Sequence, residues 1–177
     1  QKSGEFKLRA GPLFSNILLA NEINRAPPKT QAALLEALEE KQVTSEGITH
    51  KLPAPFVVLA TQNPIEQEGT YPLPEAQMDR FLMKMSMGYP DRAEEKAILA
   101  RRKLRGKDQH DVEQITSPKK VVAMQKALET VHVDPAILAY IVEIVQRTRE
   151  DHRVVNGASP RASQSLFKTG RAAAAIA

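Results

Sequence analysis

The first half of the chain alternates between short apolar runs and turns. Residues 17–20 and 56–60 are uninterrupted apolar runs, which predicts two strands buried in a sheet. Residues 81–87 are a possible third strand. The segment between the first two runs opens on Pro28, which suits the first turn of a helix, and carries leucines at helical spacing. Buried strands separated by a helix predict a mainly parallel α/β sheet.

A small hairpin is predicted after this helix. Residues 42–45 and 48–51 alternate in the manner of strands and are joined by Glu46-Gly47, a turn sequence. The charged residues at the end of the helix are expected to face water: Glu36, Glu39, Glu40 and Lys41.

The second half predicts helices only. They are expected to begin near Pro90, Pro118, Pro135 and Pro160, with Asp91 capping the first. Over 137–145, apolar residues recur at a spacing wide enough to face a core. The change in pattern predicts a boundary near Pro90, with an α/β domain over 1–89 and an all-α domain over 90–177.

Composition excludes several classes of protein. The chain has no cysteine, so disulfide scaffolds, thiolate zinc sites and cysteine nucleophiles are ruled out. No apolar stretch approaches the roughly 20 residues of a membrane span. The chain does not open with a charged and then apolar segment, so we expect no signal peptide and a cytoplasmic location.

Charge is unevenly distributed along the chain. The net charge is +4, and residues 91–177 carry 16 basic and 11 acidic side chains, against 9 and 10 in residues 1–90. The densest basic stretch, 101–107, is either a nucleic-acid patch or the solvated end of a helix. No aromatic residue interleaves with these charges, which favours the helix end.

Polar residues follow both predicted strands. Asn21 and Glu22 come directly after residues 17–20, and Asn63 comes shortly after residues 56–60. The carboxyl ends of strands in open α/β sheets are where sites form. The alternative is that these are ordinary strand ends, with Asn63 a turn residue before a proline.

Two arginines complete the candidates. Arg80 lies near the end of a short helical segment that starts at Pro74, where an arginine is usually a surface residue. Arg161 would lie in the first turn of a helix, where the dipole disfavours a cation and so hints at an anionic partner. The histidines show no zinc-motif spacing, which argues against a metalloenzyme.

Four segments together resemble the MoxR family of AAA+ ATPases. Residues 17–26 resemble that family's Walker B strand, and residues 28–37 the helix after it. Residues 60–81 resemble its sensor 1 and arginine-finger region, and residues 157–161 resemble sensor 2, opening a lid helix. Order and spacing agree across nearly the whole chain.

The resemblance implies a role for each candidate. Glu22 would be the general base that orients water at the γ-phosphate, and Asn63 would position that water or sense the phosphate. Arg80 would act in trans on a neighbouring subunit's nucleotide, and Arg161 would reach the nucleotide in cis from the lid. Residues 42–55 would be the hairpin before sensor 1, and residues 1–10 a return strand.

The sequence departs from the family's pattern at two places. The Walker A pattern G-x-x-x-x-G-K-[ST] is absent. Asn21 stands where the family has the Asp that holds the Mg²⁺ shell, so this metal position is degenerate. The implied fold is a partial AAA+ P-loop NTPase sheet lacking its N-terminal strands, followed by an all-α lid domain. The isolated chain is predicted to be inactive.

The implied function is that of a larger assembly. The parent would use ATP and Mg²⁺ in a homo-oligomeric ring, a hexamer by family analogy, to remodel or mature partner proteins. A von Willebrand factor A domain protein would be its client or partner. Two alternatives stay open. One is a non-catalytic protein-interaction module with a degenerate Walker B. The other, a nucleic-acid binder, rests only on residues 101–107.

Overall fold

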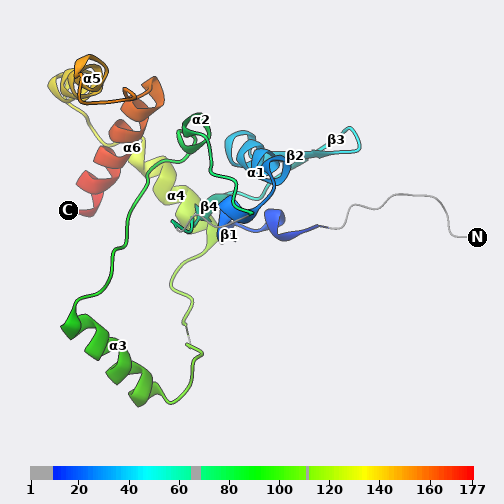
Figure 1. The fold of residues 1–177 in the computed structure, drawn as a ribbon. Helices are drawn as coiled ribbons and strands as arrows, with labels where there is room; N and C mark the ends of the chain where they lie inside the picture. The colour runs from blue at the N-terminus through cyan, green and yellow to red at the C-terminus, as the bar shows by residue number, and fades with distance from the viewer. Residues whose placement is uncertain (1–9, 65–68, 111) are drawn as a thin grey trace, which may run out of the picture. The chain divides into compact units, whose positions relative to one another are not determined.

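The computed structural model describes residues 10–64, 69–110 and 112–177. Contacts divide the chain into two units (Figure 1). The larger consists of Gln1–Leu82 and Pro118–Ala177, and the smaller is Met83–Ser117. The predicted boundary near Pro90 stays a prediction. The return strand expected over residues 1–10 lies, apart from its last residue, outside the described residues.

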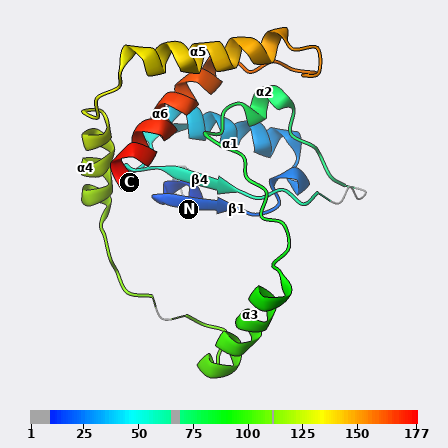
Figure 2. The ribbon, with the colours of Figure 1, turned by 90° about the vertical axis from the view of Figure 1, so that its left-hand side faces the viewer.

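Two parallel strands form one sheet of the larger unit. Strand β1 (Ile17–Ala20) pairs with β4 (Val57–Ala60) over their whole length, from Ile17 opposite Val57 to Ala20 opposite Ala60 (Figure 2). The two apolar runs are therefore neighbours, and their carboxyl ends meet at one edge. This confirms the predicted strands and their parallel pairing.

Helix α1 (Pro28–Glu40) lies between the two strands in the sequence and contributes residues to the core. Leu35 and Ala37 are each 1% exposed and belong to different clusters. Leu35 packs with Ile23 and Leu73, whereas Ala37 packs with Leu52 and Phe56. Leu18 and Val58 of the sheet join the second cluster. One face of the sheet is thus covered by α1.

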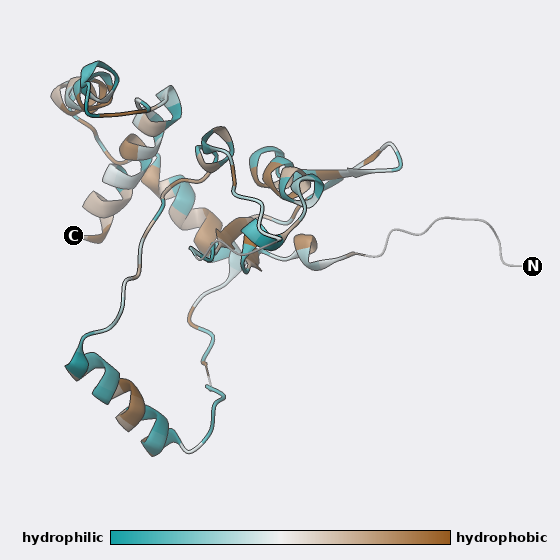
Figure 3. Cartoon of the chain, in the orientation of Figure 1, coloured by the Kyte–Doolittle hydropathy of each residue, from teal (hydrophilic) through white to brown (hydrophobic). Residues whose placement is uncertain are grey.

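The other face of the same sheet is exposed. Ile17, Leu19 and Leu59 are 66%, 63% and 55% exposed, and Figure 3 shows hydrophobic residues on both strands. Since successive side chains of a strand point to opposite faces, each strand alternates between exposed and half-buried positions. The expectation that both strands are fully buried is therefore wrong within the described part of the chain.

The predicted hairpin is present. Strand β2 (Gln42–Ser45) pairs antiparallel with β3 (Ile48–Lys51). Glu46 and Gly47 have φ of 51° and 75°, and positive φ at both central residues is what a two-residue turn of this twist requires. Two short 3-10 helices, η1 (Pro12–Phe14) and η2 (Ile23–Arg25), flank β1.

The third predicted strand is wrong. After helix α2 (Glu75–Met78), residues 81–87 form neither strand nor helix. Phe81 packs beside the cluster of Ile23, Leu35 and Leu73, whereas Met85 and Met87 are 75% and 93% exposed. An apolar run becomes a strand only where a neighbouring strand takes its backbone hydrogen bonds, and no strand of the described residues pairs with this segment.

Three helices complete the larger unit: α4 (Pro118–Leu128), α5 (Pro135–Glu150) and α6 (Pro160–Ile176). All begin at the predicted prolines. Helix α6 packs against both α4 and α5. Arg171 of α6, only 7% exposed, pairs with Glu129 at 2.8 Å. The apolar stripe of α5 buries Val145 but leaves other large residues exposed, such as Ile137 at 49% and Val142 at 48%. The expected core face is thus only partly used.

The smaller unit contains α3 (Arg92–Arg105). Asp91 caps this helix as predicted, because its carboxylate accepts from the Glu94 amide at 2.8 Å while Glu94 accepts from the Asp91 amide at 2.9 Å. Arg102, in the last turn, pairs with Asp108 at 2.6 Å. Basic residues at the end of a mostly hydrophilic helix (Figure 3) favour the helix-end interpretation of 101–107.

Candidate functional site

Thr61 joins the ends of the two parallel strands. Its hydroxyl donates to Asn21 Oδ1 at 2.7 Å and accepts from the Glu22 amide at 2.8 Å. Its carbonyl accepts from the Ile23 amide at 2.9 Å, and its own amide donates to the Ala20 carbonyl at 3.0 Å. The first residues beyond β1 are therefore held against the first residue beyond β4.

Glu22 has an unusual backbone conformation. Its φ of 50° and ψ of 53° lie in the left-handed region, which costs a residue with a Cβ roughly 1–2 kcal/mol. The bonds from Thr61 to the Glu22 and Ile23 amides hold this conformation. The Glu22 carboxylate pairs with Arg25 Nε at 2.6 Å. Such local strain is found where surrounding contacts over-determine a conformation, as at functional sites.

Asn24 holds the main chain of Asn63 at two points. Its Nδ2 donates to the Asn63 carbonyl at 3.0 Å, and its Oδ1 accepts from the Asn63 amide at 3.2 Å. Asn24 is 7% exposed, so both bonds are shielded from water. Asn63 is thereby placed beside the loop that carries Glu22, as the strand pairing predicted.

Gln31 extends this polar network into helix α1. Its side chain, 3% exposed, donates to the carbonyls of Ile23, Ala26 and Tyr71 at 3.2, 3.0 and 2.9 Å. The Tyr71 amide donates in turn to the Asn24 carbonyl at 2.6 Å. Buried polar groups that satisfy one another in this way hold loops in one arrangement.

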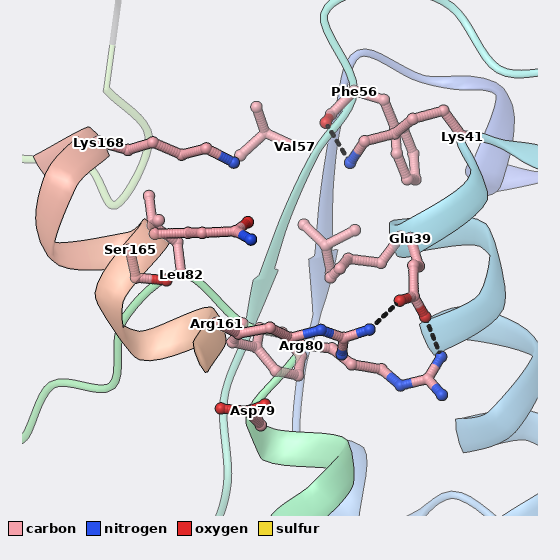
Figure 4. Close-up of a pocket in the computed structure, with 14 residues that line it drawn as sticks. Glu39, Lys41, Phe56, Val57, Asp79, Arg80, Leu82, Arg161, Ser165 and Lys168 are labelled. Atoms are coloured by element: carbon pink, nitrogen blue, oxygen red, sulfur yellow. Dashed lines mark hydrogen bonds and ion pairs between the residues drawn. The ribbon is translucent and has the colours of Figure 1, made fainter. Parts of the chain in front are cut away.

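The two candidate arginines meet at Glu39 of α1. Arg80 Nη1 donates to Glu39 Oε2 at 2.5 Å, and Arg161 Nη2 donates to Glu39 Oε1 (Figure 4). The expectation that Glu39 faces only water is therefore wrong. Arg161 does lie in the first turn of α6, and the anionic partner that its position suggested is, in this structure, the Glu39 carboxylate.

A second link ties the segments that carry these arginines. Ser159, the N-cap of α6, donates its hydroxyl to both carboxylate oxygens of Asp79, at 2.8 and 2.9 Å. The Asn156 side chain donates to the Glu75 carboxylate of α2. The start of α6 is thus bound to the end of α2, immediately beside Arg80.

An open pocket of about 410 Å³ adjoins this cluster. Its lining includes the basic residues Lys41, Arg80, Arg161 and Lys168 together with Glu39 and Phe56 (Figure 4). Lys41 Nζ lies 5.5 Å from the centre of the Phe56 ring. Partial burial lowers the pKa of Lys41 below its ordinary value. The pocket wall is therefore rich in positive charge, offset in part by Glu39 and Asp79.

The predicted site residues fall into two groups. Asn21, Glu22 and Asn63 gather at the carboxyl edge of the sheet, and Arg80 and Arg161 gather on Glu39. Sequence reasoning missed the residues that hold them, which are Asn24, Gln31, Glu39 and Thr61. Thr61 alone had a signal, since it follows an apolar run directly. The contacts of the others span 5 to 122 positions in sequence.

Within 10–64, 69–110 and 112–177, no group of three or more histidine, aspartate or glutamate side chains could hold a metal ion. No helix in the described part of the chain is long and apolar enough to cross a membrane.

Known proteins resemble this chain along nearly its whole length. Residues 1–83 match the model of the ATPase family associated with various cellular activities (AAA). The chain is 49% identical to "Uncharacterized protein YeaC" of Bacillus subtilis over 175 residues, which cover 99% of this chain and 54% of that protein. It is 43% identical to "Chaperone MoxR1" of Mycobacterium tuberculosis, with 97% and 47% covered.

A solved structure shows the same fold. A crystal structure of a protein from Cytophaga hutchinsonii superposes with a TM-score of 0.84 at 42% identity, covering 96% of this chain and 54% of that one. The chain spans about half the length of the curated relatives that it matches.

A parallel sheet with polar residues gathered at its carboxyl edge, together with these matches, places the chain among the AAA+ ATPases. Within that class it belongs to the MoxR family, whose members include relatives 43% and 28% identical to it.

Proposed function

We propose that this chain is the C-terminal part of a MoxR-type AAA+ ATPase that couples ATP hydrolysis to remodelling or maturation of partner proteins. Glu22 is the general base that orients the attacking water, and Asn63 positions that water or senses the γ-phosphate. Arg80 acts on a neighbouring subunit's nucleotide, and Arg161 contacts phosphate from α6.

The meeting of the two strand ends carries the proposal. Thr61 and Asn24 hold the segments of Glu22 and Asn63 together through six hydrogen bonds of 2.7–3.2 Å. A water between a carboxylate and an amide needs such fixed partners, because misplacement by about 1 Å can cost roughly 10²-fold in rate. The left-handed backbone of Glu22 supports the proposal as well, because strained backbone conformations of this kind are concentrated at functional sites.

The residues present do not fit a complete magnesium site. Asn21 offers a neutral oxygen that already accepts from the Thr61 hydroxyl at 2.7 Å, whereas Mg²⁺ prefers one or two carboxylates together with phosphate oxygens. We therefore assign to this chain no catalytic step through the metal. ATP and Mg²⁺ are ligands that family membership suggests for the whole protein, and residues 1–177 alone are proposed to be inactive.

The wider assembly follows from the family. AAA+ ATPases typically form oligomeric rings, and we propose a homo-oligomeric ring, a hexamer by analogy, in which Arg80 reaches the adjacent subunit. The relative from Mycobacterium tuberculosis is named a chaperone, which supports the proposal that the ATPase ring acts on a client protein. A von Willebrand factor A domain protein and a cytoplasmic location are further parts of this proposal.

Steady-state hydrolysis of ATP by the natural full-length protein tests this function. We expect Asn21→Asp to raise kcat, because it supplies the carboxylate that the resemblance to the family implies at this position. On that background Glu22→Gln should lower kcat by about 10²-fold or more, since it removes the general base. Glu36→Gln makes the same change of charge on the exposed part of α1 and should leave kcat unaltered.

Two outcomes would contradict the proposal. Absence of hydrolysis by both the natural protein and the Asn21→Asp variant, under conditions in which rings form, would favour a protein-interaction module without catalysis. Equal turnover by the Glu22→Gln and Glu36→Gln variants would remove the role given to Glu22.

A further inference from the structure

Glu39 contacts both arginines that the proposed function assigns to phosphate. Each carboxylate oxygen accepts from one guanidinium, Oε2 from Arg80 and Oε1 from Arg161 (Figure 4). All three side chains are only partly exposed, at 33%, 34% and 47% for Glu39, Arg80 and Arg161. The arginines come from α6 and the end of α2, whereas Glu39 belongs to α1.

The backbone that carries Glu39 is well anchored. Leu35 and Ala37, the preceding inward residues of α1, are each 1% exposed and belong to the two apolar clusters. The helix ends at Lys41, whose left-handed backbone places its amide on the Ala37 carbonyl at 3.0 Å. The carboxylate of Glu39 therefore projects from a rigid support, which suits a group that orients others.

The two arginines are linked at the level of the backbone as well. Asp79, next to Arg80, accepts both hydrogen bonds from Ser159, which caps the helix turn containing Arg161. The Asp79–Ser159 pair sets where the two backbones lie, and the Glu39 carboxylate sets where the two guanidinium groups lie. A long, flexible arginine side chain needs this second restraint if it is to meet a phosphate in one geometry.

Charge gives the same carboxylate a second effect. Two guanidinium groups that meet the same carboxylate repel each other, and an anion between them offsets that repulsion. Arg80 Nε is buried and has no hydrogen-bond partner in the described structure. The hydrogen bond from Arg80 Nη1 to Glu39 therefore orients this guanidinium group.

We propose that Glu39 is a positioning residue, which holds the guanidinium groups of Arg80 and Arg161 together so that both meet the phosphate of the nucleotide that Arg80 reaches. This replaces the cis role that the family resemblance implied for Arg161. The inference rests on the proposed ATPase function and adds a residue to it. Glu39 touches neither phosphate nor water in this role and acts through the two arginines.

Steady-state kinetics of the natural full-length protein, with Asn21→Asp as the reference background, test the proposal. Glu39→Gln should lower kcat about tenfold, with a change in KM for ATP of less than about twofold, because misdirected arginines act chiefly on the transition state. Glu39→Asp, which keeps the charge, should recover part of the loss. Glu40→Gln, the same change one residue along α1, should leave kcat unaltered.

A combined variant shows whether Glu39 acts through the arginines. In a protein that already carries Arg80→Ala and Arg161→Ala, adding Glu39→Gln should change kcat by less than about twofold, since coupled residues are not additive. A further tenfold loss in that background would overturn the proposal, because it would show that Glu39 acts by another route. Equal kcat for the Glu39→Gln and Glu40→Gln variants would overturn it as well.

The thermal midpoint separates a positioning role from a merely structural one. Glu39→Gln and Arg161→Gln, combined, should lower the midpoint by less than the sum of their separate effects, which would show that the pair exists in solution. Coupling in stability with an unaltered kcat would reduce Glu39 to a structural ion pair and overturn the inference alone. Absence of ATP hydrolysis by the reference protein would instead defeat the proposed function itself, and this inference with it.

Discussion

At the scale of single residues, short polar side chains decide where the candidate site lies. Thr61 and Asn24 contact the backbone amides and carbonyls of the two loops that follow the strands. A threonine or asparagine side chain is short enough to reach a neighbouring backbone without losing much rotamer freedom. Glu22 and Asn63, the residues with proposed chemical roles, are positioned by these neighbours.

Replacement of Asn24 by alanine tests this clamp without any assay of activity. The Asn24→Ala variant leaves the amide and the carbonyl of Asn63 without their partner in a shielded place, which should lower the free energy of unfolding by about 1–3 kcal/mol. Chemical denaturation measures this loss, and amide hydrogen exchange at residues 61–63 should become faster.

The control is Gln125→Ala, which removes a carboxamide side chain at an exposed position of α4. We expect it to change the free energy of unfolding by less than about 0.5 kcal/mol. Similar losses for the two variants, with unaltered amide hydrogen exchange at residues 61–63, would show that Asn24 does not specifically support Asn63.

At the scale of elements, the helices dock through close approach as well as through apolar contact. A Cβ on Gly157 would lie 2.6 Å from Arg149 Cγ and 2.8 Å from Arg149 Cα. Beside it, the Ala158 amide donates to the Thr148 hydroxyl at 2.9 Å, and the Ala158 carbonyl accepts from Arg149 Nε at 2.8 Å. The loop before α6 thus lies directly on the last turns of α5, which leaves room only for glycine.

Two glycine substitutions should have opposite effects. Gly157→Ala forces the added methyl group against the backbone of Arg149 and should destabilise the chain by about 1–3 kcal/mol. Gly170→Ala lies within α6 where a Cβ meets no atom within 4 Å, and should stabilise it by about 0.5–1 kcal/mol because alanine is the better helix former. Thermal unfolding measures both, and a neutral Gly157→Ala variant would refute the close approach.

At the scale of the whole molecule, the chain forms two units that are not continuous in sequence. Residues 118–177 return to the unit formed by the first 82 residues, and Met83–Ser117 forms a unit of its own. The sequence pattern predicted where each described helix of the second half begins. The difference in pattern between the two halves of the chain predicted a domain boundary near Pro90. The domain boundary near Pro90 stays a prediction.

Limited proteolysis with trypsin should cut within the smaller unit before it cuts helix α1 or α6. Lys84 and Lys107 are exposed and lie in segments without helix or strand, and such segments fit a protease more readily than folded elements do. Mass spectrometry at short times should therefore find cleavage after these residues before cleavage within α1 or α6. Early cleavage at Lys29 or Lys168, inside those helices, would contradict the described arrangement.

The local pattern of the sequence determined the elements and their types. Proline and capping residues marked the starts of the helices, the two apolar runs became parallel strands, and Glu46-Gly47 gave the hairpin turn. These features depend on backbone preferences within a few residues, which a sequence displays directly. The positions of Asn21, Glu22 and Asn63 at one edge followed from the strand pairing.

Tertiary structure decided what those residues contact. The Glu39 carboxylate meets Arg80 and Arg161 across 41 and 122 positions of sequence, and Asn24 meets Asn63 across 39. The exposed face of the sheet and the lack of a strand over 81–87 have the same origin, since burial and strand pairing depend on which distant segments lie alongside. No local pattern carries that information, because the free energy of these contacts arises only once the chain has brought both partners together.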